Sequence, residues 1–86
     1  MTEKTSVMAV ILENRVETAT KVQEVLTRFG CHIRTRLGLH QASADVCSNQ
    51  GLILLQLFGD NAVVQQLTQD LLQIPTVKVN SMELDL

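Results

Sequence analysis

Two short and almost continuously apolar runs, at residues 7–12 and 52–58, constrain the fold of this 86-residue chain more than any other feature. Both runs are rich in residues that favour strands, and both are too short for a buried helix. Polar or turn residues follow each run, beginning at Glu13 in the first case and at Gly59 in the second. The pattern predicts two strands with apolar side chains on both faces, as in the centre of a sheet.

An amphipathic helix is predicted over about residues 15–29, directly after the first strand. Its apolar residues recur at steps of three and four, and polar residues fill the opposite side. Asn14 followed by Glu17 resembles a capping box, and Gly30 stands where a left-handed residue ends many helices. The apolar positions are Ala19, Val22, Val25, Leu26 and Phe29.

A second helix is predicted after the second apolar run. Asp60 is placed to cap its first turn, and Pro75 forces its end because proline cannot continue a helix. Apolar residues again recur at helical spacing, at Val63, Val64, Leu67, Leu71 and Ile74.

Two further strands complete the set of elements. Residues 33–40 alternate with a period of two, which predicts one buried and one wet face. Residues 41–50 are small and polar and are predicted to form a long loop. A last strand starts at Thr76, and its apolar residues change parity after Val79, which predicts a bulge near residues 80–81 or a change of partner. In residues 33–40, the buried face is assigned to Ile33, Thr35, Leu37 and Leu39, and the wet face to Arg34, Arg36, Gly38 and His40.

This order of elements predicts an α+β fold, the ferredoxin-like βαββαβ sandwich. Its four-stranded antiparallel sheet has the strand order 4-1-3-2, with two helices on one face. The two central positions then belong to the two strands that are apolar on both faces. We expect one domain over residues 1–86, with residues 1–5 loose.

An apolar sheet face without helices predicts self-association. Four or five wet apolar side chains there forgo about 1.5 to 3 kcal/mol each, which is comparable to a domain's whole net stability. We therefore expect a homodimer or a dimer of dimers that buries this face or extends the sheet across its edges.

Charge and cysteine content argue against several classes of function. The net charge of −2, with both signs mixed, predicts no nucleic-acid partner. Cys31 and Cys47 form no CxxC pair, and no signal segment is recognised, so we expect reduced thiols and a cytoplasmic location. No apolar run approaches the length of a membrane span, so no membrane partner is expected.

Several local motifs resemble known families of regulators. Leu12-Glu13-Asn14-Arg15, followed by Val22, Val25, Leu26, Gly30 and Ile33, resembles the opening of an ACT domain, a ligand-sensing module of amino-acid metabolism. The second half is similar to the stand-alone regulators of the iron-only hydrogenase system, which in turn resemble the C-terminal effector domain of nickel-responsive repressors. Its matching segments are Arg36-Leu37-Gly38-Leu39, Gly51-Leu52-Ile53-Leu54-Leu55, Gly59-Asp60 and Val77-Lys78-Val79.

These resemblances imply a non-enzymatic regulatory module that binds a small ligand or a partner protein at subunit interfaces. They link the chain to hydrogenase or amino-acid metabolism. ACT domains that bind amino acids follow Asn-Arg with Pro-Gly, whereas Val16 and Glu17 stand here, which argues against an amino-acid ligand in that pocket. The implied ligand-binding residues are Glu13, Asn14, Arg15, Glu17, Arg36, Gly38 and His40.

A transition-metal sensor is the alternative function. His40 and Cys47 flank the predicted loop, and a symmetric assembly could bring two such pairs into one four-ligand site. Cys31-His32 is a weaker pair because its spacing does not fit a closed zinc site. Two ligands per chain are too few without symmetry, so we expect no tight metal site and no cofactor.

Catalysis is not expected. Arg34 and Arg36, predicted on one wet face, could clamp a carboxylate or phosphate, or be solvated charges without a function. No serine lies in a glycine elbow, and no carboxylate pair lies near a histidine. An acylphosphatase-like hydrolase would need phosphate-binding glycines and an arginine after the first strand, and only Arg15 is present.

Overall fold

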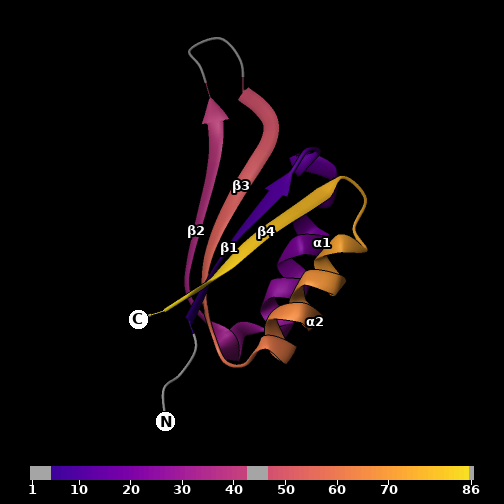
Figure 1. Cartoon of the computed structure of the whole chain (residues 1–86). Helices are drawn as coiled ribbons and strands as arrows, with labels where there is room; N and C mark the ends of the chain where they lie inside the picture. Colours follow the sequence, from indigo (N-terminus) through magenta and orange to yellow (C-terminus); the bar gives the residue numbers. More distant parts are fainter. Residues whose placement is uncertain (1–4, 43–46, 86) are drawn as a thin grey trace.

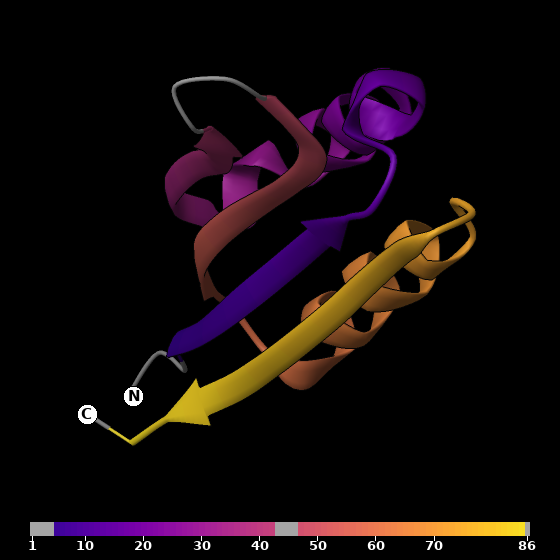
Figure 2. The same ribbon diagram turned by 90° about the horizontal axis from the view of Figure 1, so that it is seen from above.

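A computed structural model describes residues 5–42 and 47–85, and the side chains of residues 5–38 and 50–85. The chain forms a four-stranded antiparallel sheet with two helices on one side (Figures 1 and 2). We call the two faces of the sheet the helix side and the open side. The elements are β1 (Thr5–Leu12), α1 (Arg15–Arg28), the 3₁₀ turn η1 (Gly30–His32), β2 (Ile33–Ala42), β3 (Cys47–Phe58), α2 (Asn61–Leu72) and β4 (Val77–Leu84).

The strand order is β2-β3-β1-β4, which confirms the predicted order 4-1-3-2. β1 and β3, the two strands with apolar residues on both faces, take the central positions. α1 packs against β3 and β1, and α2 packs against β4. The core therefore lies between the helix side of the central strands and the two helices. It consists of Met8, Val10, Leu12, Val22, Val25, Leu26, Leu55, Leu57, Leu67, Leu71, Ile74 and Val77.

The face assignment predicted for β2 is wrong. A register shift lies between Ile33 and Thr35, so the alternation changes sides at Arg34. Leu37 pairs with Leu54 on the open side and is 51% exposed, instead of lying in the core. Arg36 pairs with Leu55 and therefore points to the helix side.

The same shift separates two arginines that were predicted to share a face. The guanidinium of Arg34 lies over the Phe58 ring, 4.6 Å from its centroid. Arg36 instead donates a hydrogen bond to Gln23 on α1. The hypothesis that both arginines clamp one anion is therefore wrong.

The predicted long loop over residues 41–50 is largely a strand pair. β2 continues to Ala42 and β3 begins at Cys47, and these two residues are partners in the register. The pairing of β1 with β3 starts only at Gly51, so the preceding part of β3 pairs with β2 alone within the described residues. The resulting two-stranded arm extends past the other strands (Figure 1). Residues 43–46 of the predicted loop lie outside the described residues.

Two helix ends differ from their predictions, and one agrees. Asp60 caps α2, since its Oδ1 accepts a hydrogen bond from the Val63 N–H at 3.2 Å. Asn14 precedes α1 but makes no side-chain capping bond, so the predicted capping box does not form. Gly30 begins the 3₁₀ turn, and it is not among the residues with positive φ.

The open side of the sheet carries no helix and is largely apolar, with Thr35, Gln56, Lys78 and Asn80 as polar residues on it. β4 pairs with β1 without interruption, so the predicted bulge near residues 80–81 is absent. Met82 therefore lies opposite Val7 on the open side, where it is 62% exposed. The register places Val7, Ala9, Ile11, Leu37, Leu52, Leu54, Met82 and Leu84 on this side. Within the described residues, no helix has the length and apolar character needed to cross a membrane.

Candidate functional site

Several predicted site residues border one strip of the helix side, between α1 and the edge strand β2. We define the α1–β2 strip by Arg15 and Gln23 of α1, Arg36 and Gly38 of β2, and Gly51 of β3. Arg36 and Gly38 are exposed, and the space where Gly38 would carry a side chain is open. The helix therefore leaves this part of β2 accessible.

Arg15 occupies one end of the strip. Its side chain crosses over Gly51, and its Cδ lies 3.0 Å from the position that a Cβ would take there. Gly51 is buried, so the missing side chain makes room for the arginine. His40 is the register partner of Gly51, which places its backbone at this end as well.

Arg36 occupies the other end, where its Nη2 donates to Oε1 of Gln23. The two ends of the strip, at His40 and Arg36, are four residues apart along β2, which corresponds to about 13 Å. The Arg15 and Arg36 side chains thus lie on either side of Gly38, which is exposed and has open space on its helix side.

Glu13 lies on the opposite flank of the molecule, toward β4. Its carboxylate forms an ion pair of 2.7 Å with Lys78, and its N–H donates to the Thr76 carbonyl at 3.4 Å. The ion pair raises the pKa of the Lys78 ammonium, mainly through the hydrogen bond to Glu13. Thr76 has a positive φ of 66°, which is unusual for a β-branched residue.

Asn14 and Glu17 belong to the first turn of α1. The Asn14 carbonyl accepts hydrogen bonds from the N–H groups of Glu17 and Thr18 and from the Thr18 hydroxyl. The Glu17 side chain is exposed. The structure therefore brings Arg15, Arg36, Gly38 and the backbone of His40 to one strip, and it does not bring Glu13 there.

The proposed metal ligands are only partly described. His40 and Cys47 lie in the two strands of the arm, and their side chains fall outside the described residues. No group of three or more His, Cys, Asp or Glu residues gathers among the residues that are described. Cys31 is exposed, and the His32 ring contacts the Phe58 ring with 6.2 Å between centroids.

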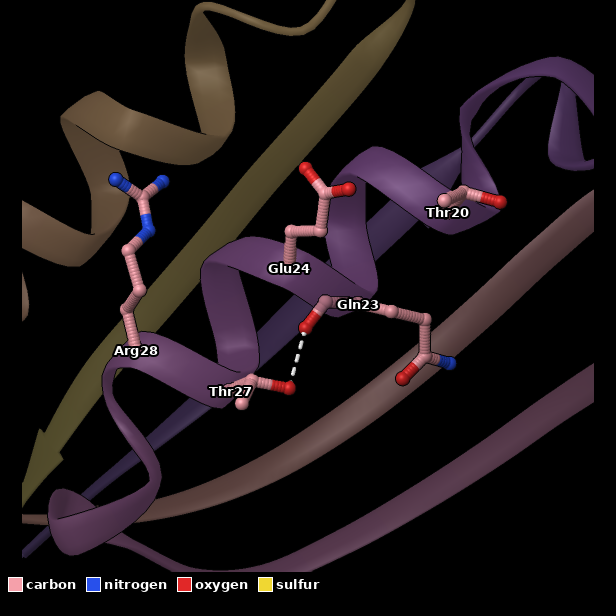
Figure 3. A pocket seen from close by; sticks show the side chains of 5 residues that line it. All are labelled: Thr20, Gln23, Glu24, Thr27 and Arg28. Atoms are coloured by element: carbon pink, nitrogen blue, oxygen red, sulfur yellow. Dashed lines mark hydrogen bonds between the residues drawn. The ribbon is translucent and has the colours of Figure 1, made fainter.

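The outer face of α1 carries a shallow hollow of about 600 Å³ (Figure 3). Its lining comes entirely from this one helix, and the Thr27 hydroxyl donates to the Gln23 carbonyl at 2.8 Å. Gln23 extends from the hollow toward the sheet, whereas Arg28 points toward α2 (Figure 3). The hollow is lined by Thr20, Gln23, Glu24, Thr27 and Arg28.

Sequence reasoning missed two residues of the strip, Gln23 and Gly51. Gln23 was classed only as a polar residue on the outside of α1, and its contact with Arg36 depends on the register shift in β2. Gly51 carried a detectable signal, because a glycine just before a long apolar strand often marks a close approach.

Over residues 4–81, the sequence matches the TM1266-like family, whose description is "Iron-only hydrogenase system regulator, putative". The chain belongs to this family. Membership confirms the resemblance to regulators of the iron-only hydrogenase system, and it supports a regulatory role. No curated protein matches the chain.

Solved structures share the fold over nearly the whole chain. The uncharacterized protein TM1266 from Thermotoga maritima is 26% identical, with 98% of this chain and 100% of that chain covered and a TM-score of 0.82. The C-terminal domain of MgtC from Mycobacterium tuberculosis is 15% identical (93% and 86% covered, TM-score 0.67). CPII, a nitrogen regulatory PII-like protein from Thiomonas intermedia K12, is 13% identical (99% and 93% covered, TM-score 0.59). The last two likenesses show the fold alone.

Proposed function

We propose that this chain is a non-enzymatic regulatory module that self-associates and binds a small anionic ligand in the α1–β2 strip. The observation that carries the proposal is the placement of Arg15 and Arg36 on either side of the exposed Gly38. Arginine binds carboxylates and phosphates through paired, charge-assisted hydrogen bonds.

A ligand that binds Arg36 would either replace Gln23 as the hydrogen-bond acceptor or bind beside it. The bond between Arg36 and Gln23 holds the guanidinium at the strip without neutralising its charge. Gly38, between the two arginines, offers backbone groups that no side chain covers. An elongated anion can therefore contact both arginines and lie against the open space at Gly38.

Self-association rests on the open side of the sheet. Its apolar side chains come from all four strands, and a hollow of about 240 Å³ between β1 and β4 is lined by Val7, Ala9, Asn80, Ser81 and Met82. Burying such a surface against another copy stabilises the assembly by about 25 cal/mol per Å² of apolar area.

Ligand binding can be tested with ADP, AMP and bicarbonate, the molecules bound to CPII, as probes. Calorimetry of the purified protein should detect at least one of them, and native mass spectrometry of freshly purified protein should detect an anion retained from the cell. Arg36→Gln and Arg15→Gln should each weaken binding about tenfold or more, because each removes a charge-assisted hydrogen bond.

Arg28→Gln is the matched control, because Arg28 lies on α1 but points toward α2 instead of β2 (Figure 3). It should leave the affinity unchanged within about twofold. If all three variants lost the same amount of affinity, the effect would come from net charge alone. That result would contradict a binding site at the strip. Absence of both probe binding and a retained anion would also reject the ligand, and would favour a partner protein at this surface.

A further inference from the structure

β4 is an edge strand, and no further strand pairs with its outer side within the part of the chain that the structure describes. β4 is the last strand in the sheet order, and its pairing with β1 runs from Val77 to Leu84 without a shift. Strand edges are usually protected against other chains by bulges, prolines or charges. β4 has eight residues, no bulge and no proline, so its edge is suited to adding another strand.

The opposite edge, at β2, is protected. Its pairing with β3 is interrupted by register shifts between Ile33 and Thr35 and between His40 and Ala42. Each edge strand carries two exposed charged residues, Arg34 and Arg36 on β2 and Lys78 and Glu83 on β4, so the register shifts alone distinguish the two edges. Of the two edges of the sheet, β4 is therefore the one that can continue it.

The surface of α2 beside β4 is uncharged, a feature that it shares with the cores of protein interfaces. The groove between them, about 390 Å³, is lined only by uncharged residues, which are Asn61, Val64, Gln65, Thr68, Gln69 and Ser81. Leu72, which is 53% exposed, follows Gln65 and Thr68 at spacings of seven and four and so lies on the same stripe. Interfaces are depleted in charged residues, and exposed surfaces are enriched in them. We call the β4 edge and this stripe the β4–α2 surface.

The outer face of α1 provides the contrast within the same molecule. It carries the exposed charges of Lys21, Glu24 and Arg28. α2 contains a single charged residue, Asp70, and its carboxylate accepts a hydrogen bond from Gln66 at 2.9 Å. The difference between the two helices indicates that α2, and not α1, faces another protein.

The backbone groups that point away from β1 can be identified. The Glu13 N–H donates to the Thr76 carbonyl, so these opposed residues form a hydrogen-bonded pair. Such pairs alternate along an antiparallel ladder. Asn80 therefore bonds toward β1, and the N–H and C=O groups of Val79 and Ser81 point outward. The Val77 N–H also points away from β1, but it donates to the Ile74 carbonyl at 3.3 Å.

We propose that the β4–α2 surface binds a second copy of this chain by antiparallel pairing of the two β4 strands, which joins both sheets into one. A two-fold axis perpendicular to the sheet keeps the helices of both copies on the same side and sets α2 beside its copy. Paired residues then share a face, as antiparallel strands require.

A second copy fits as the occupant because β4 can pair with itself without opposing like charges. Pairing centred on Asn80 places Lys78 opposite Met82 and Val77 opposite Glu83. The aliphatic part of Lys78 can then cover the exposed Met82 side chain. The open sides of the two copies also merge into one apolar surface, so this interface is compatible with face-to-face association into a dimer of dimers.

Hydrogen exchange on the intact protein tests the pairing directly. The amides of Val79 and Ser81 should exchange at least about tenfold more slowly in concentrated than in dilute protein, because association is concentration-dependent. Ser81→Pro removes an outward N–H and no bond within the chain, so it should halve the mass measured by light scattering while the circular dichroism spectrum is retained.

Asn80→Pro is the control, since it removes an N–H directed at β1 and should unfold or destabilise the chain instead. Unprotected Val79 and Ser81 amides at high concentration, or a Ser81→Pro protein of wild-type mass, would overturn the proposal. Leu37→Glu on the open side should reduce the mass without exposing the Val79 and Ser81 amides. That result separates this edge interface from the face-to-face interface of the proposed function.

Discussion

The Cδ atom of Arg15 lies 3.0 Å from the position that a Cβ atom would occupy at Gly51. The arginine begins α1, and the glycine lies where β3 starts to pair with β1. The absence of one side chain on β3 thus decides where a cation of α1 lies. This contact fixes one end of the α1–β2 strip.

We predict that Gly51→Ala lowers the free energy of unfolding by about 1 kcal/mol, because a methyl group in a buried position would displace the Arg15 side chain. Gly38→Ala is the matched control, since nothing lies within 4 Å of its Cβ position. It should be neutral, or it should stabilise the protein by about 0.5 kcal/mol, because alanine lowers the conformational entropy of the unfolded chain. Urea unfolding measures both changes, and equal effects of the two substitutions would contradict the contact.

The fold was predictable because its strongest signals are local. The apolar runs of β1 and β3, the helical spacing in α1 and α2, and the Asp60 cap all act over a few residues, and together they imply one topology. The side assignments of β2 failed for the opposite reason. A bulge at Arg34 depends on how β2 meets β3, and a single extra residue inverts every following side chain.

The candidate site was only partly predictable for the same reason. Arg15 follows a recognisable strand end, and its place on the helix was therefore expected. The contact between Arg36 and Gln23 joins residues 13 apart in sequence and exists only because the bulge turns Arg36 toward α1. The ion pair between Glu13 and Lys78 depends on the register of β1 with β4. The sequence pattern does not predict that register to the residue.

We predict that Asp60→Ala destabilises the protein by about 1 kcal/mol, because it removes the hydrogen bond that the carboxylate accepts from the Val63 N–H. Asp60→Asn should retain most of the stability, since an asparagine side chain caps a helix equally well. Thermal unfolding compares the two variants. A loss in the asparagine variant as large as in the alanine variant would assign the effect to charge and not to capping.

We predict that the ion pair between Lys78 and Glu13 stabilises the fold at pH values below the unfolded-state pKa of the lysine. Because the folded-state pKa of Lys78 is raised, this contribution is lost as pH rises through that raised value. Glu13→Gln should remove both the shift and the alkaline loss of stability. The amine nitrogen can be titrated by NMR, and a Lys78 pKa that is identical in the wild type and in Glu13→Gln would contradict the pairing.

The two faces of β3 should respond differently to the same charge. Leu55 is 2% exposed on the helix side, whereas its neighbour Leu54 is half-buried on the open side. Leu55→Glu places a carboxylate in the core, where no partner is available among the apolar side chains of the two helices. We predict that this variant fails to fold.

Leu54→Glu should leave the core intact but place a charge in the face that we expect to be covered by a second copy. We predict a folded protein with a wild-type far-ultraviolet circular dichroism spectrum and a lower assembly mass by sedimentation, because an unpaired charge in a dry interface costs several kcal/mol. Leu54→Ala is the control, and it should weaken association less than the charge does. If the wild type already sediments at the monomer mass of 9.5 kDa, or if Leu54→Glu unfolds as completely as Leu55→Glu, then the open side is not an interface between copies.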